Sequence, residues 1–260
     1  MSENSNEVIT GAGVITENGS ELFNDYENNT ASGTYTHAEG ENTTATGRAT
    51  HAEGKNTTAS CTGAHAEGWD SVASAHGAHA EGYSTAEGNY SHAEGYLAKT
   101  TGANSHAEGK QTVASGQNSH AEGQNTEASG EASHAEGTNT KATGKASHSE
   151  GRGTRATGDG AHAEGWSSHA TGADSHAEGE SCQANGDCSH AGGYYSFANY
   201  NNQTVIGTYN KNKANTLFEV GNGTPTARSN AFEVYADGSI SVGGVVITPD
   251  RLRALVNLIS

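Results

Sequence analysis

Residues 120–133 read HAEGQNTEASGEAS, and residues 134–147 read HAEGTNTKATGKAS. The same pattern begins at twelve histidines, fourteen residues apart, except for one step of thirteen residues between His79 and His92. The short step indicates that one residue is missing within 83–86. A fixed period of this length predicts a solenoid, in which each repeat is buried against its neighbours.

The composition excludes a conventional globular core. Leu, Ile, Val and Phe account for only 27 of the 260 residues, and between residues 37 and 193 only Val72, Leu97 and Val113 belong to this group. So few apolar residues, together with a net charge of −17, are typical of disordered chains. A disordered chain, however, has no reason to keep one pattern in register through twelve copies. The regular period therefore favours an ordered fold that buries small residues.

Each repeat contains two related halves, Ser/Thr-x-Ala-x-Gly followed by two linking residues, as in 133–137 and 140–144. Since alternate side chains of a strand point to opposite faces, Ser, Ala and Gly share one face while His and Glu share the other. The small residues are expected to face inward, where two strands approach closely. We predict an all-β fold of two short strands per coil, with the coils stacked in parallel at about 4.8 Å. Because burying Ala contributes little free energy, we also expect the chain to oligomerise.

The half-repeat resembles the head repeat of trimeric autotransporter adhesins, whose left-handed parallel β-rolls associate as trimers. The Ser-His-Ala-Glu-Gly version, with the flanking segments 21–29, 220–224 and 227–232, more specifically resembles minor structural and tail-fibre proteins of phages and prophages of Gram-positive bacteria. The resemblance extends from about residue 20 to residue 243. It implies a left-handed parallel β-roll, or β-solenoid, with 14-residue coils, a homotrimer, a small β-rich C-terminal cap and a short terminal helix.

Three features separate the chain from the autotransporter adhesins. Residues 1–7 are acidic and contain no apolar stretch, so we expect no N-terminal secretory signal. No segment is long enough to cross a bilayer as a helix, and the C-terminus has no series of membrane strands. About 67 residues follow Gly193, too few for the self-cleaving chaperone domain that ends some relatives. These features favour a particle component that leaves the cell by lysis.

Four parts are predicted along the chain. They are an attachment or capping segment at 1–30, the β-solenoid at 31–200, a β-rich cap at 201–248 and a helix at 249–260. The cap regains apolar residues, which predicts a small apolar core shared among three chains. Its short strands are expected at 203–207, 216–220, 231–235 and 239–242.

The C-terminal helix has clear start signals. Thr248 is its expected N-cap and Pro249 its first residue. Its apolar residues fall on one face, which predicts a three-helix plug; a docking helix for another virion protein is the alternative. This face consists of Leu252, Leu255, Val256 and Ile259.

His and Glu occupy strand positions that are typically Val and Ile in the adhesins. If the resemblance transfers, they line the trimer axis as a polar ladder, in which an imidazole donates its ring hydrogen to a carboxylate. We then expect assembly to raise the histidine pKa values. The predicted trimer-interface ladder consists of His37, Glu39, His51, Glu53, His65, Glu67, His79, Glu81, His92, Glu94, His106, Glu108, His120, Glu122, His134, Glu136, His148, Glu150, His162, Glu164, His176, Glu178 and His190.

Three other interpretations of the ladder stay open. It could be a solvated face copied by duplication, a metal array or a catalytic site. His and Glu two residues apart share a strand face and could form borderline metal sites, but no Cys/His closure with zinc-like spacing is present. Acid–base catalysis needs carboxylates in different environments, whereas these are near-equivalent. We therefore predict no catalytic residue, no cofactor, no metal and no enzymatic activity. Cys61, Cys182 and Cys188 have no motif spacing and are treated as repeat substitutions.

Aromatic residues follow the Gly of the His-Ala-Glu-Gly motif in five coils. Three of these coils are successive, so their side chains are expected to form an exposed strip suited to sugar rings or a protein partner. The structural alternative is that they only cover the edge of the roll. The candidate recognition residues are Trp69, Tyr83, Tyr96, Trp166 and Tyr194.

The predicted function is that of a structural fibre or receptor-binding component of a phage tail or phage-derived particle, which mediates attachment to the host surface. The expected partners are copies of the chain itself, other tail or baseplate proteins, and a host glycan or protein. The acidic balance argues against nucleic acid, and no membrane insertion is expected. The expected location is the virion, assembled in the host cytoplasm and released extracellularly. The alternatives are a bacterial surface trimeric adhesin and a glycan-cleaving tailspike.

Overall fold

The computed structural model describes residues 8–10, 13–15, 19–23 and 28–259. The chain is mostly β-structure and forms a β-solenoid of about 14 turns, followed by one short helix in the described C-terminal part. It divides into two compact units, residues 1–135 and residues 136–260. The predicted all-β solenoid with a terminal helix is therefore confirmed.

The first unit begins with three short strands. β1 (Val8–Thr10) and β2 (Gly13–Ile15) pair antiparallel, as do β2 and β3 (Glu21–Phe23), and β3 then pairs in parallel with the first His-Ala-Glu-Gly strand. Most of the predicted attachment segment at 1–30 lies outside the described residues.

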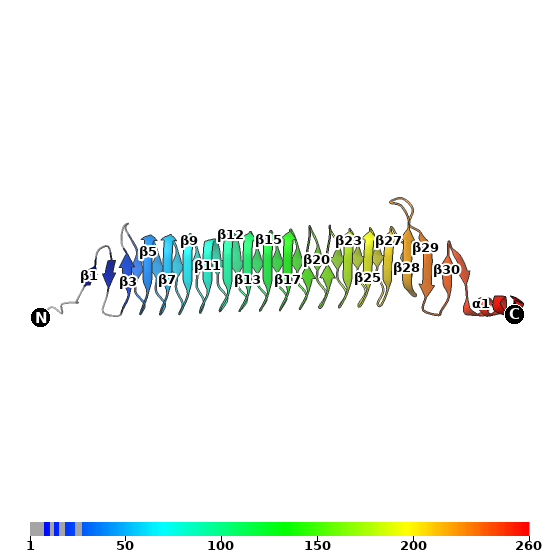
Figure 1. The fold of residues 1–260 in the computed structure, drawn as a ribbon, viewed down its shortest axis with the longest axis horizontal. Helices are drawn as coiled ribbons and strands as arrows, with labels where there is room; N and C mark the ends of the chain where they lie inside the picture. The colour runs from blue at the N-terminus through cyan, green and yellow to red at the C-terminus, as the bar shows by residue number, and fades with distance from the viewer. Residues whose placement is uncertain (1–7, 11–12, 16–18, 24–27, 260) are drawn as a thin grey trace. The chain divides into compact units, whose positions relative to one another are not determined.

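Each coil of the first unit contributes a longer and a shorter strand, and equivalent strands of successive coils lie side by side in parallel (Figure 1). The longer strands are β5 (His37–Glu41), β7 (His51–Lys55), β9 (His65–Trp69), β11 (His79–Ala86), β12 (His92–Thr100), β13 (His106–Lys110), β15 (His120–Gln124) and β17 (His134–Thr138), which runs across the boundary between the units. The shorter strands are β4 (Thr30–Ala31), β6 (Thr44–Ala45), β8 (Thr58–Ala59), β10 (Val72–Ala73), β14 (Val113–Ala114) and β16 (Glu127–Ala128).

Small side chains fill the interior of the coils that carry the His-Ala-Glu-Gly motif. Ala107 of β13 and Ala114 of β14 are fully buried, and so is the Ser105 that precedes β13. His106 and Glu108, which alternate with them, remain partly exposed. The predicted division of faces is therefore confirmed: Ser, Thr and Ala build the inside, and His and Glu point outward.

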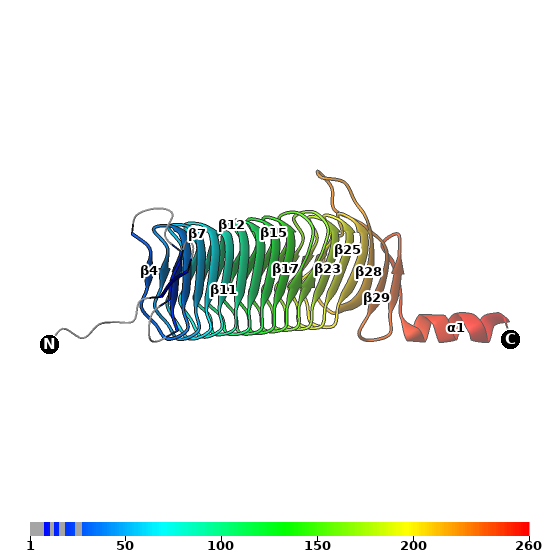
Figure 2. The same cartoon turned by 60° about the vertical axis from the view of Figure 1, so that its left-hand side comes forward.

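The Gly of the His-Ala-Glu-Gly motif is required where adjacent backbones meet. Gly109 has a φ of 108°, and a Cβ atom placed on it would lie 2.3 Å from the carbonyl oxygen of Gly123 in the next coil. No other residue type accepts that conformation at that distance. Figure 2 shows the coils stacked closely on one another, and a glycine at this position permits that close approach.

The second unit repeats the arrangement. The strands that begin at the ladder histidines or at the equivalent Thr204 are β19 (His148–Ser149) and β21 (His162–Ala163), of two residues each, and β23 (His176–Glu180), β25 (His190–Tyr194) and β27 (Thr204–Thr208), of five. Its shorter strands are β18 (Lys141–Ala142), β20 (Arg155–Ala156), β22 (His169–Ala170), β24 (Gln183–Ala184) and β26 (Phe197–Ala198). Cys182 occupies the buried position that Thr154 and Ser168 occupy in earlier coils, and none of the three cysteines is in a disulfide.

The parallel stacking continues beyond residue 200, where the cap was expected to start. β27 pairs in parallel with β25, and β28 (Thr216–Asn222) pairs in parallel with β27. The stacked region therefore extends about 20 residues further than the predicted boundary. The register places Glu219 next to Val205, and Val205 next to Ala191, so a glutamate occupies an inward position.

The single chain buries polar side chains at this end, and the predicted apolar core shared among three chains stays a prediction. Glu219 and Gln203 are fully buried beside Val205, whereas Leu217 is 45% exposed and Ile206 is 39% exposed. Ile206 follows the inward Val205 and therefore points outward. Sequence composition could not reveal this, because it does not fix which face of a strand turns inward.

The chain ends in a meander and a helix. β29 (Asn230–Tyr235) pairs antiparallel with β28, β30 (Ile240–Val242) with β29, and β31 (Val245–Ile247) with β30. The helix α1 (Pro249–Ile259) starts at the predicted residue, and the Thr248 hydroxyl accepts a hydrogen bond from the backbone N–H of Arg251 at 3.3 Å. No residue of α1 is buried in the single chain.

Candidate functional site

The ladder histidines form a stacked column in each unit. From His51 to His134 the centroids of successive imidazole rings lie 4.6 to 4.9 Å apart, and the rings are within 6° of parallel. From His148 to His190 the spacing is 4.8 to 5.0 Å. The predicted coil spacing is therefore confirmed. The first ring, that of His37, is turned by 81° against its neighbour.

The ladder glutamates lie beside these columns. His65 Nε2 is 3.8 Å from Glu67 Oε2 of its own coil, and His190 Nε2 is 3.2 Å from Glu178 Oε1 of the preceding coil. Most of the other pairs lie 3.4 to 3.8 Å apart, longer than a normal hydrogen bond. The structure thus brings the predicted His and Glu residues together within each unit. Whether a second chain covers them stays a prediction.

The pKa of several ladder histidines is lowered. Burial first, and then the charge of the neighbouring histidines, lowers the pKa of His65, His92, His120 and His176, and the adjacent glutamates oppose this shift only in part. The expected rise in pKa concerned imidazoles that face the carboxylates of another chain. Within one chain the direction is the opposite, because burial disfavours the charged imidazole and, to a lesser extent, protonated neighbouring rings repel one another.

We expect acid to destabilise the single-chain ladder. A histidine whose pKa is lowered by folding binds protons more readily when unfolded, so its contribution to stability is complete above the free-histidine pKa of about 6.5 and is lost as pH falls through the lowered values. At a concentration where light scattering shows single chains, the melting temperature followed by circular dichroism should therefore fall between pH 7 and pH 5. A single chain whose melting temperature rises over this interval would contradict the lowered pKa values. For three chains assembled with the ladder at their interface, raised pKa values are expected, and the melting temperature should rise instead.

The metal-array interpretation stays open. The ligand atoms of His106, Glu108 and His120 lie within 4.8 Å of one another. His and Glu side chains that come this close are residue types that bind divalent transition metals.

The thirteen-residue coil lacks its corner residue. The coils on either side turn at a residue with positive φ, namely Asp70 (55°) and Leu97 (58°). No residue from 83 to 86 has a positive φ, and β11 runs without a break. The register between β11 and β12 shifts after Tyr83, so that Thr85 pairs with Lys99. The residue missing from the thirteen-residue coil is therefore the positive-φ residue at which the other coils turn.

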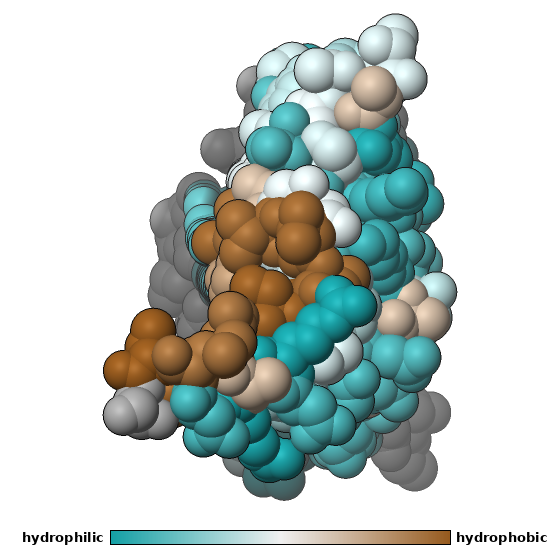
Figure 3. Space-filling model, turned by 90° about the vertical axis from the view of Figure 1, so that its right-hand side faces the viewer, coloured by the Kyte–Doolittle hydropathy of each residue, from teal (hydrophilic) through white to brown (hydrophobic). Residues whose placement is uncertain are grey.

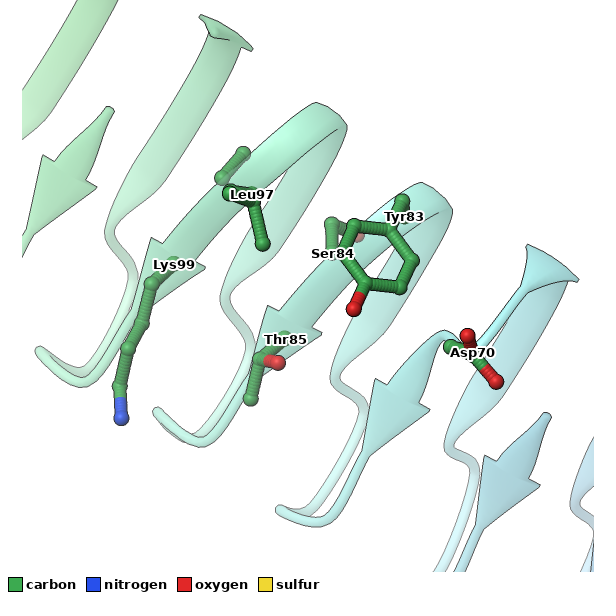
Figure 4. A pocket seen from close by; sticks show the side chains of 7 residues that line it. Asp70, Tyr83, Ser84, Thr85, Leu97 and Lys99 are labelled. Carbon is green, nitrogen blue, oxygen red and sulfur yellow. The ribbon is translucent and has the colours of Figure 1, made fainter. Parts of the chain in front are cut away.

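The missing residue leaves a notch in the edge of the first unit. Figure 4 shows Asp70 and Leu97 on either side of Tyr83, with Thr85 and Lys99 on the same side of the coils. We call this feature the corner notch. It is lined by Asp70, Tyr83, Ser84, Thr85, Leu97, Ala98 and Lys99.

An aromatic pocket opens beside the corner notch. Trp69, Asp70, Tyr83 and Tyr96 line a volume of about 380 Å³, within the range of small-molecule sites. The rings of Tyr83 and Tyr96 stack with centroids 5.5 Å apart, and the Trp69 side chain is 60% exposed. The predicted exposed strip of these three aromatic residues is therefore confirmed.

Asp70 adds a polar group to the aromatic pocket. The Asn42 amide donates to Asn56 Oδ1 at 3.1 Å, and the Asn56 amide donates to Asp70 Oδ1 at 2.7 Å. This row of hydrogen-bonded side chains at the corners ends at Asp70, because the next coil has no corner residue. Among the described residues no side chain donates to the second carboxylate oxygen of Asp70. Sequence reasoning did not single out Asp70, although the thirteen-residue step marks its position.

The other two candidate aromatic residues lie in the second unit and have different surroundings. Trp166 is 53% exposed, and the guanidinium carbon of Arg152 lies 5.6 Å from the centre of its ring. Tyr194 packs edge-on against Tyr195 and Tyr209. Tyr194 therefore covers the edge of its coil, which was the structural alternative, while Trp166 presents an open face.

No protein-family model matches the chain, and no curated protein is significantly similar to it. Within the described ranges, no helix combines the length and the apolarity needed to cross a bilayer. The ladder, the corner notch and the aromatic pocket are therefore the features from which a function can be inferred.

Proposed function

We propose that the chain is a structural fibre component of a phage tail or phage-derived particle, and that it binds a host-surface glycan through the aromatic pocket. The observation that carries this proposal is the place of the pocket. Three aromatic side chains and a carboxylate gather where the fourteen-residue period of the first unit is broken. Aromatic faces pack on the apolar faces of sugar rings, and a carboxylate accepts hydrogen bonds from their hydroxyl groups.

The proposal includes the left-handed homotrimer that the resemblance implies, with the His/Glu ladder at its interface. One finding supports assembly. At the C-terminal end of the second unit, apolar side chains gather on the surface (Figure 3), among them Val245 and Leu258.

The assembly proposal predicts a particular mass. Light scattering of the full chain after size-exclusion chromatography should give three times the 26.5 kDa of one chain, because the exposed apolar residues of α1 and β31 are then buried between copies. A mass of 26.5 kDa at micromolar concentration would contradict the trimer.

Binding through the aromatic pocket predicts a loss on removing its rings. The Trp69→Ala/Tyr83→Ala double variant should lose at least about tenfold in affinity for cells of the strain that encodes the chain, because two aromatic contacts contribute about 1 kcal/mol each. Flow cytometry with labelled protein measures this binding. Tyr90→Ala is the control, since Tyr90 is 70% exposed but does not line the pocket. Equal binding by the double variant and the parent chain would remove the pocket from the proposal.

Two alternatives can be separated by location and chemistry. Antibodies against the chain should label particles in a lysate, whereas a bacterial surface adhesin predicts labelling of intact cells. A glycan-cleaving tailspike predicts that host polysaccharide becomes shorter on incubation with the chain. Polysaccharide of unchanged length would exclude this third function.

A further inference from the structure

The aromatic pocket contains one carboxylate, that of the half-buried Asp70. The Asn56 amide donates to its Oδ1 atom at 2.7 Å. Within the described part of the chain, no lysine, arginine or histidine forms an ion pair with Asp70. An amide donates a hydrogen bond but brings no positive charge. The pocket therefore has one unbalanced negative charge beside its aromatic rings.

The three aromatic rings of the pocket are unevenly spaced. Tyr83 and Tyr96 stack with their centroids 5.5 Å apart. Trp69 belongs to the coil before Tyr83, but among the described residues these two rings make neither a stacked nor an edge-on contact. Two rings on adjacent coils that do not stack leave room between them, and both line the pocket together with Asp70. A ligand group can therefore reach aromatic surface and the carboxylate at once.

The Trp69 ring already has one ammonium group of the chain beside it. Lys55, in the preceding coil, places its Nζ atom 5.5 Å from the centre of the ring. Lys55 does not line the pocket, and it pairs with Glu41 at 3.0 Å, so its charge is balanced. An aromatic face attracts a cation, and tryptophan does so most strongly. The indole that lines the pocket is thus suited to a second, external cation.

Two further lysines limit where an external cation binds. Lys99 lines the corner notch, but its ammonium group pairs with Glu87 at 3.0 Å. Lys110 follows Tyr96 in register on the next coil, and its charge would repel a cation placed over that ring. The favourable position is therefore the other end of the pocket, next to the carboxylate and the indole.

We propose that the glycan bound by the aromatic pocket carries a positively charged ammonium group, which lies between Trp69 and Tyr83 and pairs with Asp70. This inference rests on the proposed function and names the chemical class of its ligand. A free amino sugar and an alkylammonium substituent share this chemistry. A neutral sugar would leave the charge of the carboxylate unbalanced. The net charge of −17 also favours the approach of a cationic ligand.

The fluorescence of a single tryptophan tests this inference on the full chain. The sequence has two tryptophans, so Trp166→Phe leaves Trp69 as the only one. Titrations at neutral pH and constant ionic strength compare choline with dimethylbutanol, its neutral analogue in which carbon replaces nitrogen. Glucosamine and N-acetylglucosamine give the same comparison for an amino sugar. We expect the Trp69 emission to report at least about fivefold tighter binding of the charged member of a pair.

Asp70→Asn in the same background removes the negative charge alone. Asparagine keeps an oxygen that accepts the hydrogen bond from Asn56, and Asn56 itself occupies the equivalent corner of the preceding coil. We expect at least about fivefold weaker binding of the charged ligand. Asp159→Asn is the matched control, because Asp159 Oδ1 also accepts one hydrogen bond, from the backbone N–H of Lys145 at 2.9 Å, but lies in the other unit. It should leave the binding unchanged.

The results separate the ligand class from the proposed function. Binding of both neutral compounds as tight as that of the charged ones, or full binding by Asp70→Asn, would overturn the ammonium group. A neutral glycan in the pocket would still make the Trp69→Ala/Tyr83→Ala variant lose its binding to cells. Cell binding retained by that variant contradicts the proposed function instead. Whichever of choline and glucosamine binds more tightly identifies the source of the ammonium group, and binding of neither overturns the inference.

Discussion

Replacing Gly109 by alanine is expected to lower the free energy of unfolding by about 4 kcal/mol, through backbone strain and overpacking together. Its φ of 108° is a conformation that side chains rarely adopt, and the added Cβ would lie 2.3 Å from the carbonyl oxygen of Gly123. That carbonyl belongs to the backbone of the next coil, so relief requires the two coils to separate. Urea unfolding followed by circular dichroism measures the change.

Gly63→Ala is the matched control for this substitution. Gly63 also has a positive φ, of 69°, but a Cβ there would meet no atom closer than 3.9 Å. The preceding coil has Ala49 at the equivalent corner with a φ of 53°. We expect a change within about 1 kcal/mol. Equal effects of the two substitutions would show that the close approach of the coils does not determine stability.

Replacing Glu219 by leucine is expected to cost about 3 kcal/mol, because buried donors lose their acceptor. The Asn210 amide and the Thr216 hydroxyl each donate to the Glu219 carboxylate at 2.7 Å, and the backbone N–H of Lys213 donates at 2.8 Å. The carboxylate is fully buried. Leucine has a similar size, so lost hydrogen bonds rather than a cavity would cause the effect.

Glu219 accepts a hydrogen bond from Asn210, the residue at which the ladder of shorter strands ends. The Asn210 amide donates to the Phe197 carbonyl at 2.9 Å, and the Phe197 N–H donates to Asn210 Oδ1 at 2.8 Å. Asn210 thus satisfies the two groups that a further coil would otherwise pair. Glu219→Leu should make the end of the second unit exchange its amide hydrogens faster than the coils before it.

Two further substitutions serve as controls for Glu219→Leu, and urea unfolding measures the stability of all three variants. Glu87→Leu breaks an exposed pair with Lys99, whose atoms are 3.0 Å apart, and should cost less than about 1 kcal/mol. Glu219→Gln retains one acceptor oxygen and should fall between the two leucine variants. A Glu219→Leu chain as stable as Glu87→Leu would show that the buried network contributes nothing measurable.

Hydrogen bonds also hold a second carboxylate at this end of the chain, that of Glu233. Burial alone would raise the pKa of Glu233, but hydrogen bonds from Lys213, Tyr235 and Asn230 lower that pKa to about 2. The contribution of this lowered pKa to stability is complete above the ordinary glutamate pKa of 4.5 and is lost as pH falls from there through about 2. Between pH 7 and pH 5 the ladder histidines therefore dominate the expected change in stability.

The repeat made most of the coil predictable. The alternation in residues 105–108 correctly assigned small residues to the inside and His and Glu to the outside, because a strand has a side-chain period of two. The thirteen-residue step correctly located an irregular coil, and the start of the helix at Pro249 followed from local capping signals. These features depend on a few consecutive residues, so the sequence contains them in full.

Strand periodicity did not predict where the solenoid ends or which residues line the sites. Glu219 lies inside because its strand stacks in register on Val205, a contact that local sequence does not specify. The pKa of His120 is lowered because the stacked coils bury its ring and place other histidines beside it. By itself, the sequence determined the coil, its faces and its interruption, through strand periodicity. Only the tertiary structure decided that Asp70 lies beside three aromatic rings, because stacking brings residues of different coils together.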